Sequence, residues 1–178
     1  MTGISVMMLV VLGSLSLLVA GIQCFDRTVS RTGLSSTNAQ GIRRVSEAIR
    51  GAMTVSVSAD GTQVTYTMPA ISPTVDAITG EKELVDPLTS DGVNRSFRVD
   101  FTAGTLIDGT TGRVLVKNIT RTDPDSKSSQ YNQQYNPFQL TTIGSLRAVS
   151  INLITLERTQ SGTRFVRLKN TASVRNAQ

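Results

Sequence analysis

The sequence predicts an α+β protein in which one long N-terminal helix packs against an antiparallel β-sheet. Three observations lead to this fold class. Residues 1–25 carry no charge, apolar residues of helical period continue to about residue 52, and short alternating runs follow from residue 54 onward. The chain of 178 residues, 39% of them apolar, has room for one modest domain. We therefore expect an apolar helix half (1–25), an amphipathic helix half (26–53) and a β-rich head (54–178).

Residues 1–25, read as a helix, are long enough to cross a membrane. They would span about 37 Å at roughly 1.5 Å per residue, against a hydrocarbon core of about 30 Å. Three interpretations stay open. A cleavable secretory signal would end near Ala20 but lacks a basic start. A lipoprotein signal would end at Cys24, although Gln23 is not the small residue expected before it. A permanent anchor would continue as one helix, and the absence of proline before Pro69 favours it.

The amphipathic half is expected to bury one face on the sheet. Ile42, Val45 and Ile49 recur at steps of three or four, with charged residues largely on the other faces. Gly41 weakens this helix by about 1 kcal/mol relative to alanine. Gly51 is placed to help end it.

The rest of the chain has the pattern of β-strands. Residues 54–58 and 63–68 alternate around a four-residue turn and predict a hairpin. Further strands are expected over 97–101, 105–107, 113–120, 148–156 and 164–170. Residues 70–94 contain proline and glycine turns, and residues 121–139 are polar and contain Pro124 and Pro137. Both stretches are interpreted as loops. We expect these strands to form one antiparallel sheet that lies against the amphipathic half of the helix.

The composition argues against an enzyme. The chain has no histidine and one cysteine, which excludes Ser-His-Asp and Cys-His catalysis, histidine zinc sites and disulfides within the chain. The spacing from Gly104 to Gly109 matches a phosphate loop, but Thr110 stands where that loop needs lysine. We expect no catalytic residue, no cofactor and no enzymatic activity.

Asp123 and Asp125 begin like a calcium loop, with acids at its first and third positions. Pro124 between the acids and Lys127 at the fifth position argue against it. We interpret the segment as a turn and expect no metal.

Charge is uneven along the chain, whose net charge is +5 and whose pI is about 9.9. The C-terminal segment is basic, and this permits binding to DNA or another polyanion, with a plain solvated surface as the alternative. The candidate residues for polyanion binding are Arg164, Arg167, Lys169 and Arg175.

The chain resembles the type IV pilin and pseudopilin superfamily. The start, with Met1, Thr2 and the apolar run that includes Val6 and Val10, is similar to mature N-termini of type IVb-like pilins. Residues 41–69 resemble the helix-to-hairpin junction of prepilin-type proteins, and residues 112–121 and 173–176 resemble the heads of the minor, J-type branch. The resemblance implies a pilin-like fold, a leader removed just before Met1, and methylation of the Met1 amine.

The resemblance also implies a filament core made by the N-terminal helix. Gly13, Leu17 and Gly21 share one helix face at a spacing of four, where small residues allow close packing. The residues expected in the core are Met1, Thr2, Ser5, Val6, Val10, Gly13, Leu17 and Gly21. Ser5 stands where the family has a glutamate that pairs with a neighbour's N-terminal amine, and Ile22 replaces a family proline.

The expected function is that of a structural subunit of an extracellular or periplasmic type IV pilus-like filament. The expected partners are further copies of the chain, the pilus assembly machinery, and the inner membrane before assembly, with the cell surface as the final location. Two alternatives remain: a minor tip pseudopilin of a secretion or DNA-uptake machine, and a single-pass anchored binding module that never polymerises.

Overall fold

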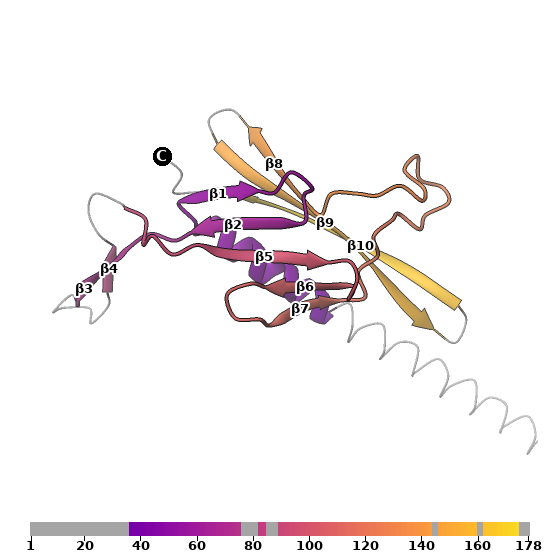
Figure 1. Cartoon of the computed structure of the whole chain (residues 1–178), viewed down its shortest axis with the longest axis horizontal. Coiled ribbons are helices and arrows are strands. Elements are labelled where there is room, and N and C mark those ends of the chain that lie inside the picture. Colours follow the sequence, from indigo (N-terminus) through magenta and orange to yellow (C-terminus); the bar gives the residue numbers. More distant parts are fainter. Residues whose placement is uncertain (1–35, 76–81, 85–88, 144–145, 160–161, 175–178) are drawn as a thin grey trace, which may run out of the picture. The chain divides into compact units, whose positions relative to one another are not determined.

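The structure is a computed structural model that describes residues 36–75, 82–84, 89–143, 146–159 and 162–174. These lie almost entirely in one compact unit, Thr37–Gln178. The described residues form mostly antiparallel β-structure, with one helix over residues 36–50 behind the larger sheet (Figure 1).

The larger sheet has five strands in the order β1-β2-β5-β6-β7. Its strands are β1 (Thr54–Val57), β2 (Gln63–Thr67), β5 (Arg95–Asp100), β6 (Thr105–Asp108) and β7 (Val114–Lys117). Each strand pairs antiparallel with its neighbour. Alternate side chains such as Val64, Phe97 and Leu106 are buried beneath it, as the period of two requires.

The smaller sheet has three strands in the order β10-β9-β8. Its strands are β8 (Phe138–Ile143), β9 (Leu146–Thr159) and β10 (Gly162–Ser173). Beyond the end of β8, the edge of β9 meets the chain that leaves β7. The Thr120 amide donates to the Ile154 carbonyl at 2.9 Å, and the Leu156 amide donates to the Asn118 carbonyl at 2.7 Å. These bonds join the two sheets.

The helix over residues 36–50 supplies the middle of the core. Ile42, Val45 and Ile49 are buried and belong to the same hydrophobic cluster as strands of both sheets. Asn170 Nδ2 donates to Ser46 Oγ at 2.8 Å and ties the helix to β10. Gly41 lies so close to β7 that a Cβ there would overlap the Leu115 carbonyl. The glycine at position 41 therefore allows the helix and β7 to pack closely, although glycine is a poor helix former.

A two-stranded ribbon, β3 (Ile71–Val75) with β4 (Lys82–Leu84), extends from the five-stranded sheet (Figure 1). The ribbon falls in the stretch that the sequence predicted to be a loop. It exposes Ile71, Val75 and Leu84, each more than half accessible. Such a ribbon has little core of its own.

The predicted α+β, pilin-like architecture with one long N-terminal helix is wrong. The described residues are mainly β, and their one helix is short, from residue 36 to residue 50. In the part of the chain that the structure describes, no helix is long and apolar enough to cross a membrane. The prediction extended a helix through an unbroken apolar run, and such a run has no period that identifies a helix. Residues 1–35 lie outside the described residues.

Candidate functional site

The sequence-predicted site residues fall into two groups. The filament-core residues, which run from Met1 to Gly21, and the basic Arg175 lie outside the described residues. The others lie on two elements of the β-structure. Asp123 and Asp125 belong to the segment that joins β7 to β8, residues 118–137, called here the 118–137 loop. Arg164, Arg167 and Lys169 lie on β10.

The structure brings three of these residues together. Arg167 Nη2 donates to both carboxylate oxygens of Asp123 at 2.7 Å, and it lies 3.5 Å from Asp125 Oδ2. The Asp125 amide donates to Asp123 Oδ1 at 3.0 Å, in the turn that the sequence predicted. The Asn132 amide donates to the Asp123 carbonyl at 2.8 Å. The ion pair therefore joins a closed loop to the sheet.

Asp123 is almost fully buried, with 1% of the residue exposed. Burial by itself raises the pKa of a carboxyl group, but the Asp125 amide and the Arg167 guanidinium outweigh it. They hold the pKa of Asp123 below its usual value. The carboxylate is thus charged at neutral pH, and Arg167 neutralises it inside the protein.

This arrangement does not fit a calcium ion. Calcium takes six to eight oxygen ligands, and here a guanidinium occupies the space that both aspartates face. Among the described residues, no three acidic, cysteine or histidine side chains converge on one point. Asp123 and Asp125 therefore take part in a turn that an ion pair with Arg167 stabilises.

The basic residues of β10 are divided between the two faces of the strand, with Arg167 and Lys169, two positions apart, on one face. Arg167 is opposite Ile154 of β9, on the sheet face that the 118–137 loop covers. Arg164 is an odd number of residues away and lies on the opposite face of the strand. With Arg167 engaged by Asp123, the predicted polyanion cluster loses its central member. Binding to DNA stays a prediction.

Tyr135 fixes the other end of the 118–137 loop. Its hydroxyl donates to the Thr120 carbonyl at 2.7 Å and accepts from the Ile154 amide at 3.1 Å. Its ring meets that of Phe101 edge to face, with centroids 6.1 Å apart. Burial raises the pKa of Tyr135 to about 12. The loop is thereby held against β9.

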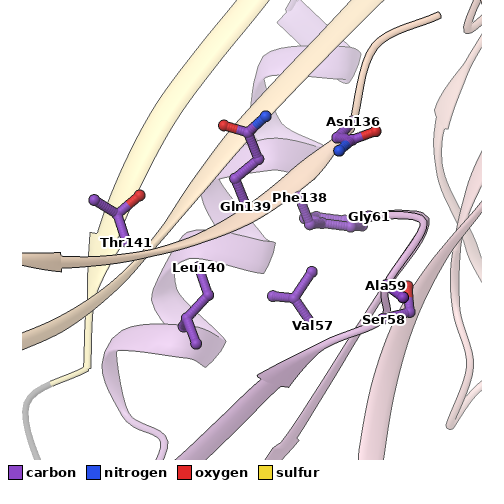
Figure 2. Close-up of a pocket in the computed structure, with 9 residues that line it drawn as sticks. All are labelled: Val57, Ser58, Ala59, Gly61, Asn136, Phe138, Gln139, Leu140 and Thr141. Carbon is purple, nitrogen blue, oxygen red and sulfur yellow. The ribbon is translucent and has the colours of Figure 1, made fainter.

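A groove of about 410 Å³ opens between β8 and the β1–β2 hairpin. Figure 2 shows Val57 and Leu140 pointing into it from opposite sides, while Gln139 and Thr141 lie on the other side of β8. The sequence analysis missed this groove because it assigned residues 121–139 to a loop. The uncharged alternating run at residues 138–143 was the signal that could have found it.

No protein family, curated protein or solved structure matches this chain. The function therefore has to be inferred from the residues themselves.

Proposed function

We propose that this chain is a structural subunit of an extracellular or periplasmic filament and that it assembles through residues 1–25. The observation that carries the proposal is the absence of any charge over this apolar run. Such a segment is stable in a lipid bilayer before assembly and equally stable among like segments that exclude water. If such segments contact each other head to tail with a rotation that does not close into a ring, they build an open polymer.

The β-structure supports a division of the chain into an assembling segment and a head. Among the described residues, the hydrophobic cluster runs from Ile42 to Val174 and joins the helix to strands of both sheets. A head with its own core can remain outside an apolar layer while residues 1–25 stay inside it.

The relation to type IV pilins stays a prediction, and the long-helix architecture is no part of the proposal. Under the prediction, the inner membrane holds the subunit before assembly, the filament is exposed at the cell surface, and Met1 carries a methylated amine. Ser5 lacks the charge of the family's glutamate, which keeps a minor tip subunit as the rival role in the same class.

A second candidate function is a membrane-anchored binding module that does not polymerise. The open groove between β1 and β8 favours it, because grooves with few charges are common binding surfaces. The two functions differ in whether the full-length chain forms polymers.

Removal of residues 1–25 separates these functions. In the filament proposal, the shortened chain is a folded monomer by sedimentation and circular dichroism, whereas the full-length chain sediments as polymers after shearing from cells. Full-length chain that stays monomeric in membranes at native expression contradicts the proposal and favours the binding module.

A further inference from the structure

The groove between β1 and β8 separates two strands that are both sheet edges. In an antiparallel pair, the backbone groups of alternate residues point away from the partner strand. In β1, the register places the backbone N–H and C=O groups of Val55 and Val57 on the outer edge of the strand. In β8, it places the backbone groups of Leu140 and Thr142 on the outer edge. Among the described residues, the N–H groups of these four bond to no other element.

The other sheet edges in the described part of the chain are protected against strand addition. Charged side chains and proline protect an edge because they disfavour pairing with another chain. The protecting residues are Lys117 on β7, Arg164 and Lys169 on β10, Lys82 on β4, and Pro73 on β3, which has no N–H to donate. Strands β1 and β8 carry neither charge nor proline. The two unprotected edges are therefore the two that line the groove.

Leu140 marks a gap in the core layer. It pairs with the buried Val149 and lies on the same face of β8 as Phe138, which is 1% exposed. Leu140 itself is 44% exposed, although it faces inward. An apolar side chain placed between Leu140 and Val57 would complete the layer.

The groove is preformed and uncharged. The Phe138 amide donates to the Gly61 carbonyl at 2.9 Å and closes one end of it. Gly61 has a φ of 66°, and a Cβ there would overlap Asn136 Cβ and the Phe138 carbonyl, so this end is tightly fixed. None of the nine lining residues is charged (Figure 2). A fixed groove avoids part of the ordering cost of binding.

We propose that this groove binds an extended, uncharged segment of a partner polypeptide, which adds as a strand to the free edge of β8. Backbone groups of the segment pair with those of Leu140 and Thr142, and one of its apolar side chains packs between Leu140 and Val57. A charged side chain at that place would lose its water without gaining a partner. None of the nine lining residues belongs to the stretch 1–25, so the proposal does not depend on polymerisation of the chain.

The test uses the full-length chain in detergent micelles and a fluorescent peptide of about six residues with alternating threonine and valine. The control peptide has the same sequence with alternate amides methylated, so that it cannot donate to a strand edge. We expect saturable binding of the first peptide only, with slowed hydrogen exchange at the amides of Leu140 and Thr142.

Variants of β8, with a control on β10, locate the binding. Leu140→Lys places a charge in the groove, and Thr163→Lys places the same charge on β10, at an exposed residue that does not line the groove. We expect Leu140→Lys to weaken binding about tenfold or more and Thr163→Lys to leave it unchanged. Thr142→Pro removes an N–H that points away from β9, at an edge position where proline is tolerated. It should weaken binding as well, and it tests the proposal if Leu140→Lys does not fold. Absence of binding, equal binding by all variants, or pairing of β8 with a second copy of the chain in place of the peptide overturns the proposal.

Discussion

Arg167 Nη2 lies 2.7 Å from both carboxylate oxygens of Asp123, a residue 44 positions earlier in the chain. The pair connects the 118–137 loop to β10, and the aspartate is the more buried partner, with 2% of its side chain exposed against 28% for the arginine. A buried charge that loses its partner is costly, because it has already lost its water. The loop should therefore depend on both residues together.

Loss of either partner should loosen the loop. We expect Arg167→Met and Asp123→Asn each to lower the melting temperature and to speed hydrogen exchange at the Asn132 amide, which donates to the Asp123 carbonyl. The double variant should lose less than the two single losses combined, because the second change removes a group that is already unpaired. Strictly additive losses would show that the pair does not act as a unit.

The Asp123 carboxylate should make the unfolding free energy of the protein depend on pH in the acidic range. The folded-state pKa of Asp123 is below its ordinary value of 3.8. Its contribution is therefore fully present above about pH 4 and is lost as the pH falls through the folded-state pKa. The difference in unfolding free energy between the native chain and Asp123→Asn should shrink as the pH is lowered from 6 toward about 2. A difference that stays constant over this range would contradict the assignment.

Gly41→Ala should destabilise the protein even though alanine is the better helix former. The added methyl would overlap the Leu115 carbonyl, so helix and sheet must separate. Overpacking of this kind costs about 1–3 kcal/mol, more than the gain of about 1 kcal/mol from helix propensity. Urea unfolding measures the difference. Gly51→Ala is the matched control, since its nearest contact is the flexible end of Met68, and it should be tolerated.

Tyr135→Phe should cost about 1–3 kcal/mol, because the Ile154 amide loses its acceptor in a buried place. Tyr131 is 54% exposed, so Tyr131→Phe should have little effect on unfolding. Absorbance titration of the native chain should show one phenol that ionises only near pH 12. Equal effects of the two substitutions would remove Tyr135 as the anchor of the loop.

Local pattern predicted the central strands but not the arrangement of the sheets. The hairpin of β1 and β2 is confirmed, with Val55 opposite Tyr66 and Val57 opposite Val64. Its signal was local, since alternation and a turn lie within a few residues of each other. Strand β8 was missed because its first two residues were assigned to the loop over 121–139, which contains prolines at 124 and 137, and residues 140–143 were assigned to no strand. The pairing of β8 with β9 depends on the three-dimensional fold and has no local signal in the sequence.

The candidate site shows the same limit. The sequence identified Asp123, Asp125 and Arg167 as chemically distinctive residues and assigned them to separate roles. Their actual relation spans 44 positions and depends on how the 118–137 loop covers β9 and β10. No local spacing encodes such a contact. Charge signs alone could have suggested an ion pair, but not which arginine makes it.

The measurement that tests the central claim most directly is electron microscopy of sheared surface material, combined with mass spectrometry of its protein. The filament proposal predicts polymers that contain this chain with residues 1–25 intact, and no polymers from cells that express the chain without them. Surface material that lacks the chain, with the full-length protein recovered as membrane-bound monomers, would contradict it.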